Sequence, residues 1–342
     1  MKPGSFILMV LSLSAALSVS SCGGASSSGN SETPPASGQE AKFQKGGGPK
    51  VGEPAMGGAK RPKPDAALQA LIDRTLPKFR QNVWKNAEGD TLAYNICTPA
   101  DMKDGEKYPL VLFMADASTP GTDITLPLTQ GYGGLVWATD EFQKQNPCFV
   151  IVPQYPYIEV DNQWQTGKQV DMTIAMIKDL CKRSPVDTDR LYTTGQSMGG
   201  MMSMYFNVKY RGFFAASLYV ACEWDISKLK DFKDDRFVYI AAEGDPGGHG
   251  GQVELMELFK KEDAAYGYAT WSARLPETEQ DSLASALLKE GYRCNFITFE
   301  GNTVLPAGTD MNNLPPAADH MASFNYAYRL APVRDWLFRQ HK

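Results

Sequence analysis

Ser197 lies in the run Gly-Gln-Ser-Met-Gly at 195–199, and it is the residue of this chain best suited to nucleophilic chemistry. The run follows an apolar segment at 190–194 and precedes a helical pattern. A sharp turn from strand to helix strains the serine backbone and raises the hydroxyl to its tip, and it needs small flanking residues because strand and helix come close together. The N–H of Met198, at the helix N-terminus, would then point at a developing oxyanion.

A serine hydroxyl is a weak nucleophile, so a general base must lie within hydrogen-bonding distance. The chain has three histidines. His341 is the penultimate residue. His249 lies in a glycine-rich turn, and if it were the base, the acid would have to come after it in the chain. His320 lies in a predicted loop before the last predicted helix, and a triad in the order serine, acid, histidine favours it as the base.

Asp245 is the candidate acid that would orient the imidazole. It follows the apolar run at 237–241 directly and lies between the serine and His320 in the chain. Such a carboxylate would hold the imidazole tautomer and stabilise the imidazolium. The surrounding Glu-Gly-Asp-Pro-Gly-Gly is equally a good turn sequence, so Glu243 and Asp225 remain alternative acids.

These residues must be positioned by alternating strands and helices. Short apolar runs bounded by turn residues are typical of strands buried on both faces; they occur at 108–114, 148–152, 190–194, 214–220 and 237–241. Helical patterns lie at 170–180, 251–262 and 322–339. The alternation predicts an α/β fold, a mostly parallel doubly wound sheet with helices on both faces. In such folds ligands bind beyond the carboxyl ends of the strands.

Residues 1–21 are predicted to be a targeting segment. Lys2 is followed by an apolar run at 6–17 that is too short to span a bilayer comfortably. The run ends in Val-Ser-Ser-Cys, which resembles the lipobox of bacterial lipoproteins and predicts lipidation of Cys22. An ordinary secretory signal is the alternative. We therefore expect an extracytoplasmic protein anchored to a bacterial membrane by its acyl chains, at the outer membrane or the cell surface.

Residues 22–64 are predicted to be a flexible tether, because a segment rich in Ser, Gly and Pro cannot bury enough apolar surface to fold. The folded domain is expected over 65–342. A net charge of −5 gives no electrostatic footprint for nucleic acid. The five cysteines beyond Cys22 are an odd number, so at least one thiol stays free, and buried thiols explain three of them as well as a disulfide would.

The chain resembles a bacterial "predicted peptidase" branch of the α/β-hydrolases, close to feruloyl esterases, acetyl-xylan esterases and polyhydroxybutyrate-depolymerase-like enzymes. The resemblance covers about 92–340. It depends on segments at 108–113, 146–154, 186–192, 195–201 and 335–338. It implies the α/β-hydrolase fold, acyl transfer without a cofactor, and a second oxyanion N–H from the loop that begins at Ala115.

Two departures from this branch stand out. Its members usually carry His-Gly where this chain has Ala115 and Asp116, and a carboxylate beside an oxyanion hole would repel the charge that forms there unless it points away. The interval between Asp245 and His320 is also long, so the region around 271–306 is expected to be an insertion.

The sequence therefore favours a serine hydrolase acting on an ester, on a small molecule or a polysaccharide decoration. A serine peptidase of the same fold and a degenerate hydrolase that only binds a ligand are the alternatives. Gln196, Trp164 and Trp224 are weaker candidates for substrate contacts. Trp137 is a further tryptophan that could line an aromatic or sugar-binding cleft with Trp164 and Trp224. No cofactor, metal site or nucleic-acid partner is expected, since the chain has no HExxH motif or histidine cluster.

Overall fold

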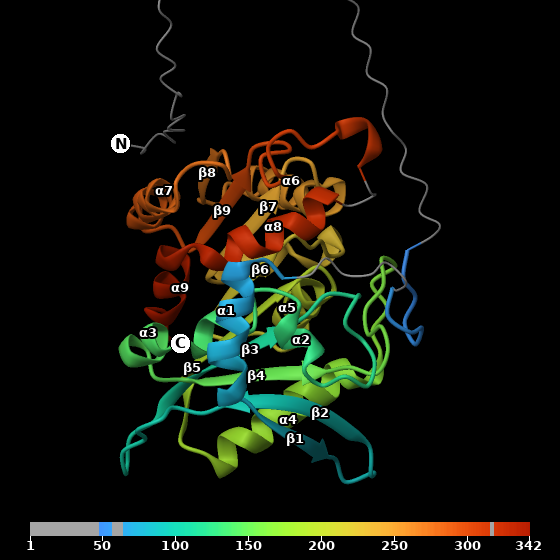
Figure 1. Cartoon of the computed structure of the whole chain (residues 1–342), viewed down its shortest axis with the longest axis vertical. Helices are drawn as coiled ribbons and strands as arrows, with labels where there is room; N and C mark the ends of the chain where they lie inside the picture. The colour runs from blue at the N-terminus through green and yellow to red at the C-terminus, as the bar shows by residue number, and fades with distance from the viewer. Residues whose placement is uncertain (1–47, 57–63, 315–317) are drawn as a thin grey trace, which may run out of the picture. The chain divides into compact units, whose positions relative to one another are not determined.

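The computed structural model describes residues 48–56, 64–314 and 318–342. Its described part from Gly48 to Lys342 forms one compact unit built on a nine-stranded sheet (Figure 1). The strand order is β1-β2-β4-β3-β5-β6-β7-β9-β8. The strands are β1 (Arg80–Lys85), β2 (Thr91–Cys97), β3 (Tyr108–Met114), β4 (Phe149–Gln154), β5 (Val186–Gln196), β6 (Ala216–Val220), β7 (Phe237–Ala242), β8 (Gly267–Trp271) and β9 (Cys294–Phe299).

The predicted fold class is confirmed. The seven strands from β4 to β8 in this order run parallel, and at the other edge β2 pairs antiparallel with both of its neighbours, β1 and β4. The five predicted apolar runs form the central strands β3 to β7. Their side chains are buried on both faces because helices cover both, so they read as continuous apolar runs.

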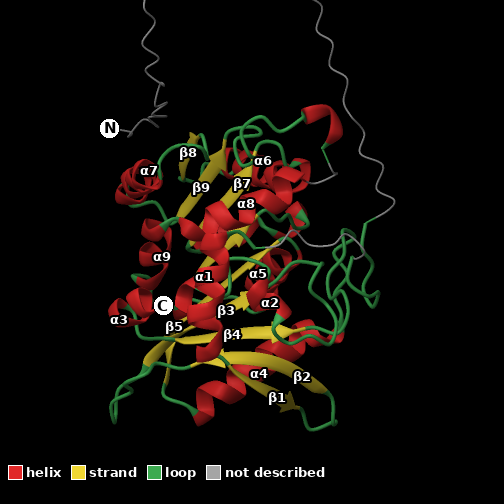
Figure 2. Cartoon of the chain, viewed as in Figure 1, coloured by secondary structure: helices red, strands yellow, loops and turns green. Residues whose placement is uncertain are grey.

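Helices separate into two layers, one on each face of the sheet (Figure 2). Alternate residues of β3 point to opposite faces: Leu110 and Leu112 join the core beneath one layer, and Val111 and Phe113 join the other. The first layer has α4 (Lys168–Arg183), α5 (Met198–Lys209) and α6 (Pro246–Lys261). The second has α1 (Ala66–Thr75), α3 (Asp140–Gln145), α7 (Glu277–Lys289), α8 (Ala318–Arg329) and α9 (Ala331–Phe338).

The structure corrects the single helix predicted at 322–339. It is two helices, α8 and α9, separated at Leu330, whose backbone is extended. Pro332 is the cause, because it cannot donate an intrahelical N–H and its ring excludes the preceding carbonyl, so it belongs in the first turn of a new helix. The first of the two helices, α8, also begins four residues before the predicted helix, at Ala318, and therefore includes His320.

The region at 271–306, predicted to be an insertion, contains α7, which lies in the second helix layer, and β9, which lies in the sheet. Strand β9 pairs with β7, and β8 is the outer edge strand. The chain thus leaves β7, forms α6, β8 and α7, and returns to the position beside β7. This connection between the neighbouring strands β7 and β9 therefore contains the edge strand β8 and the helix α7.

Residues 48–56 lie within the predicted tether, yet they belong to the compact unit. Signal segment 1–21, Cys22 and tether residues 23–47 lie outside the described residues. Within the described part, no helix is long and apolar enough to cross a membrane. The five described cysteines are free thiols, four of them buried.

Candidate active site

Ser197 occupies the strained turn that the sequence predicts, between β5 and α5. Its φ is +50° and its ψ −120°, a conformation that side-chain-bearing residues rarely adopt. Its N–H donates to the carbonyl of Val220, 3.0 Å away, which fixes the turn against the end of β6. The serine is half-buried, so the hydroxyl is reachable from solvent.

The flanking glycines are required by close backbone contact. A Cβ on Gly195 would lie 2.3 Å from the carbonyl carbon of Gly199. A Cβ on Gly199 would lie 2.0 Å from the carbonyl oxygen of Met114 and 2.9 Å from that of Ala115. The first turn of α5 therefore touches the end of β3, which places the loop after β3 beside the nucleophile.

The predicted oxyanion donors lie at this contact. Met198 is the first residue of α5, so its N–H has no acceptor within the helix. The loop that begins at Ala115 approaches from the end of β3. Asp116, whose negative charge would repel an oxyanion, lies in this loop. Its Oδ1 accepts hydrogen bonds from the N–H of Ser118, at 2.8 Å, and from the Ser118 hydroxyl.

Gln196, predicted as a weaker candidate for a substrate contact, bonds to the loop that follows β3. It is buried, and its Nε2 donates to Oδ2 of Asp116 at 3.0 Å. Both carboxylate oxygens of Asp116 are thus engaged, one by Gln196 and one by Ser118. Gln196 holds the loop beside the nucleophile, and the sequence offered no sign of this because the two residues are 80 positions apart.

Asp245 and His320 meet as predicted: Nδ1 of His320 lies 2.7 Å from Oδ2 of Asp245. Asp245 follows β7 and is buried, with its side chain 5% exposed, while that of His320 is 18% exposed. A proton on Nδ1 would be donated to this carboxylate and would leave Nε2 as an acceptor. His320 lies in the first turn of α8 and not in a loop, and its ring stands edge-on to Phe324 at 5.0 Å.

The three residues lie at the same edge of the sheet. Ser197 follows β5, Asp245 follows β7, and α8 packs across β6 and β7. Within the described residues, however, the Ser197 hydroxyl has no hydrogen bond with His320 or with another group. Catalytic hydrogen bonds are often long before a substrate binds, so this arrangement is compatible with a triad that tightens on binding.

The alternative acids and histidines are engaged elsewhere. Glu243 is exposed and accepts the N–H of Gly301 at 2.8 Å, and Asp225 caps a short 3₁₀ helix through Ser227. His249 lies within α6, 3.4 Å from Gln252. His341 is exposed near the last residue. The described residues contain no cluster of three or more His, Cys, Asp or Glu that could hold a metal ion.

Asp319, beside the base, is a feature of the site that the sequence did not suggest. It is 4% exposed, and its Oδ1 has no hydrogen-bond partner. Burial raises the pKa of its carboxyl, and the charge of Asp245 adds to the effect. A Cβ on Gly244 would come within 2.4 Å of the Asp319 carboxyl carbon, so Gly244 leaves room for this second carboxyl next to the Asp245–His320 pair.

Two of the three tryptophans considered as substrate contacts lie at the catalytic edge. Trp164 follows β4, Trp224 follows β6, and their rings are 5.6 Å apart. Trp164 has a positive φ of 63° and is half-buried. Trp137 is fully buried and stacks on Phe338 in the core, so the interpretation of Trp137 as a cleft residue is wrong.

Residues 48–56 form a strap beside this edge. The N–H of Gly52 donates to the carbonyl of Ile158, and the N–H of Ile158 donates to that of Glu53, both at 2.9 Å. The N–H of Met56 donates to the carbonyl of Ala117, also at 2.9 Å. The strap therefore contacts the loop that would complete the oxyanion hole.

Comparison with known proteins identifies the fold. No family model matches the chain, and no curated protein matches its sequence. A thermostable esterase superposes with a TM-score of 0.61 at 24% identity, over 79% of this chain and 64% of that one, so this chain spans less than two thirds of that esterase. A structure named FAE superposes with a TM-score of 0.51 at 13% identity, over 82% of this chain and 94% of the other. The chain has the α/β-hydrolase fold.

Proposed function

We propose that this chain is a serine hydrolase that cleaves esters, with Ser197 as nucleophile, His320 as general base and Asp245 as the residue that orients the base. The observation that carries the proposal is the 2.7 Å contact between Asp245 and His320, at the sheet edge where Ser197 occupies its strained turn. An acid, a base and a half-buried nucleophile at one edge are the components of acyl transfer.

The reaction follows from the geometry. Rotation of the Ser197 hydroxyl toward His320 would allow Nε2 to take its proton as Oγ attacks the carbonyl carbon of the ester. The tetrahedral oxyanion would receive hydrogen bonds from Met198 N–H and from the loop after Ala115. As the bond from the carbonyl carbon to the alcohol oxygen breaks, His320 returns the proton to the leaving alcohol. In the second half of the reaction His320 takes a proton from the water that attacks the acyl carbon, and returns it to Oγ of Ser197 as the acid is released.

The fixed orientation of Asp116 supports turnover over a protein that only binds. Gln196 and Ser118 bind its two carboxylate oxygens through neutral donors, so the carboxylate keeps its charge but is held in one direction, and the loop that would carry the second oxyanion N–H is held with it. An ester as the substrate class is supported by the family resemblance and by the esterase of similar fold. We infer that the esters are aryl or acetyl decorations of polysaccharides. The half-buried Trp164, whose ring packs on the buried Trp224 after β6, supports this.

A fluorophosphonate probe tests the nucleophile. We expect the unit 48–342 to be labelled rapidly, and labelling to be lost in Ser197→Ala and reduced at least 100-fold in His320→Ala. His249→Ala is the matched control and should label as the parent does. A folded parent that the probe leaves unlabelled would overturn the proposal.

The bond class needs a second measurement on the same preparations. Aryl acetates, feruloylated and acetylated xylan, and peptide anilides would be compared by kcat/KM. Turnover of the esters, lost in Ser197→Ala, is the expected result. Cleavage of the anilides at a higher kcat/KM than of every ester would instead identify a serine peptidase.

We also propose that the mature chain is anchored by acyl chains on Cys22, which lies outside the described residues. The lipobox-like run at 19–22 supports this. Expression of the full chain in a bacterium and membrane fractionation would test it. We expect membrane association in the parent and release in Cys22→Ala; equal association of the two would contradict the anchor.

A further inference from the structure

A cavity of about 420 Å³ lies at the sheet edge opposite the candidate active site. Its lining includes Ala216 at the start of β6, Arg236 just before β7 and Arg293 just before β9. Ser197 and Asp245 follow the carboxyl ends of β5 and β7, so the parallel strands separate the two sites. A strand of five residues spans roughly 17 Å, which sets the scale of that separation.

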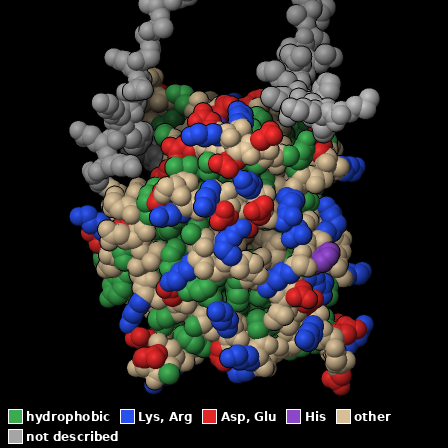
Figure 3. Space-filling view, turned by 180° about the vertical axis from the view of Figure 1, so that it is seen from behind, with side chains coloured by type: hydrophobic (Ala, Val, Ile, Leu, Met, Phe, Trp, Pro, Cys, Tyr) green, Lys and Arg blue, Asp and Glu red, His purple; other side chains and the backbone are tan. Residues whose placement is uncertain are grey.

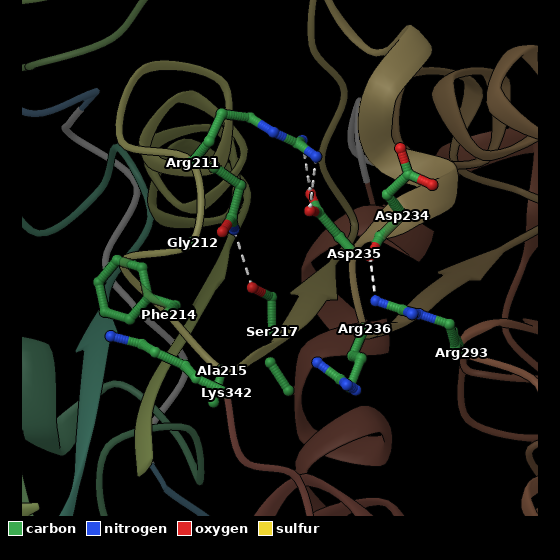
Figure 4. Close-up of a pocket in the computed structure, with 12 residues that line it drawn as sticks. Arg211, Gly212, Phe214, Ala215, Ser217, Asp234, Asp235, Arg236, Arg293 and Lys342 are labelled. Carbon is green, nitrogen blue, oxygen red and sulfur yellow. Dashed lines mark hydrogen bonds and ion pairs between the residues drawn. The ribbon is translucent and has the colours of Figure 1, made fainter. Parts of the chain in front are cut away.

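The cavity concentrates positive charge. Arg211, Arg236, Arg293 and Lys342 line it, together with the carboxylates Asp234 and Asp235 (Figure 4). The chain as a whole carries a net charge of −5. On the face shown in Figure 3 the Lys and Arg side chains are interspersed with Asp and Glu, as on an ordinary surface.

Only one of the three arginines is neutralised by a carboxylate. Arg211 forms an ion pair with Asp235 at 3.1 Å. Arg293 donates to the main-chain carbonyl of Asp234, which holds its guanidinium in place. Among the described residues Arg293 forms no ion pair, although its charge attracts the nearby Asp235 carboxylate. Among the described residues, the Arg236 side chain has no hydrogen bond or ion pair.

The structure holds Arg236 in position through its backbone. Its carbonyl accepts the N–H of Ser217 at 3.0 Å, at the point where β6 and β7 begin to pair. In Figure 4 its guanidinium lies on the side of the cavity away from Asp235, with no partner drawn to it. A planar group with five donors is thus presented to the cavity without an acceptor.

We propose that this cavity binds the phosphate group of a small molecule, with Arg236 and Arg293 as its principal ligands. Guanidinium groups match the geometry of phosphate oxygens with paired hydrogen bonds. A phosphate carries about −1.5 to −2 charges at neutral pH, which balances two unpaired guanidinium groups better than a single carboxylate does. A volume of about 420 Å³ admits a small molecule and lies within the ~300–1,000 Å³ usual for ligand sites.

Titration calorimetry with inorganic phosphate tests the site on the unit 48–342 at constant ionic strength. We expect saturable binding, weakened at least tenfold in Arg236→Gln and in Arg293→Gln, because a hydrogen bond to a charged group contributes about 1.5–3 kcal/mol. Arg80→Gln, which changes an exposed arginine on β1, is the matched control and should bind within twofold of the parent. Esterase activity of the Arg236→Gln variant should stay at the parent level and shows that it is folded.

Two results would overturn the proposal. Absence of saturable heat with phosphate would show that the cavity takes no phosphate. Equal weakening in Arg80→Gln and Arg236→Gln would show a general electrostatic effect. Sedimentation with phosphatidylglycerol vesicles separates a lipid headgroup from a small molecule: binding to vesicles that depends on Arg236, without binding of free phosphate, would contradict the small-molecule assignment.

Discussion

The side-chain amide of Gln196 donates a 3.0 Å hydrogen bond to the carboxylate of Asp116, and this bond joins the strand that carries the nucleophile to the loop beside it. Both side chains are buried, each about 3% exposed. The bond engages the one oxygen of Asp116 that Ser118 does not, so both carboxylate oxygens are fixed and the loop is held beside the nucleophile.

We expect Gln196→Ala to lower kcat about tenfold or more and to leave KM within about threefold, because a misplaced oxyanion donor costs transition-state stabilisation. Steady-state kinetics on an aryl acetate measure this. Asp116→Asn should lower kcat less than Gln196→Ala does. The new amide oxygen can still accept from Ser118, and if the Gln196 amide turns over, its oxygen can accept from the new NH₂ group. Equal kcat in the parent and Gln196→Ala would show that the loop is held by other contacts.

Gly199→Ala should abolish activity and destabilise the fold. Its Cβ would lie 2.0 Å from the Met114 carbonyl oxygen, which is main chain and cannot move aside, so we expect a loss of about 1–3 kcal/mol. Gly250→Ala is the control, because nothing lies within 4 Å of its Cβ and alanine favours helix α6 by about 0.5–1 kcal/mol. Urea unfolding of both variants measures the difference, and unchanged stability in Gly199→Ala would contradict the close contact.

Two adjacent glycines in α6 differ in how closely they approach Asp245. A Cβ on Gly248 would lie 2.4 Å from Oδ2 of Asp245, the oxygen that contacts His320, and 2.7 Å from the main-chain Cα of Ala221, whereas one on Gly247 would lie 3.7 Å from Oδ1. We expect Gly248→Ala to reduce kcat about 10–100-fold through a displaced carboxylate, and Gly247→Ala to keep it within twofold. Urea unfolding of both variants accompanies the kinetics, so that a loss of stability is told apart from a displaced carboxylate. Similar kcat values in the two variants would mean that the position of the carboxylate does not limit the reaction.

The sequence predicts the parts of this molecule that local constraints determine. The turn at Ser197 is recognisable because only glycines tolerate its contacts, and β3 to β7 because strands buried on both faces are continuously apolar. The strands β1, β2, β8 and β9 are not among the five predicted runs. Strand β1 is largely exposed and β8 is buried only at its two end residues, so an apolar run is missing in each.

The site residues follow the same division. Asp245 and His320 could be proposed because chain order and position after a strand or before a helix limit the choices. The bond between Gln196 and Asp116 and the buried Asp319 depend on three-dimensional contacts between distant segments. The strap at 48–56 lies in the predicted tether because the segment 22–64 is rich in Ser, Gly, Pro and Ala, whereas main-chain hydrogen bonds attach the strap to the folded unit.

Glu159 gives the stability of the protein a distinct pH dependence. Burial raises the pKa of its carboxyl from 4.5 to about 7. Backbone N–H donors at the start of α4 lower the pKa by a smaller amount. The folded state therefore binds the proton more tightly than the unfolded state, and stability falls as pH rises from about 4.5 to 7 and then levels off. The difference in pKa corresponds to about 3 kcal/mol at most.

Glu159→Gln removes this titration. We expect the variant to match the parent near pH 4.5 and to exceed its free energy of unfolding by about 1–3 kcal/mol at pH 8. Urea unfolding across this pH range measures the difference. Glu106→Gln, at a largely exposed carboxylate, is the control and should show a constant offset. A stability difference that stays constant with pH in Glu159→Gln would contradict the raised pKa.

The strap at 48–56 should influence catalysis through a single backbone hydrogen bond. The N–H of Met56 donates to the carbonyl of Ala117, while the Met56 side chain is 55% exposed. Met56→Pro removes the donor, and Met56→Ala keeps it and removes only the exposed side chain. We expect Met56→Pro to lower kcat/KM for an aryl acetate about three- to tenfold, since the loss of one hydrogen bond amounts to about 0.5–1.5 kcal/mol, and Met56→Ala to stay within twofold. A truncated chain that begins at 57 should match Met56→Pro. If both variants and the truncated chain retained the parent kcat/KM, the strap would cover the loop without positioning it.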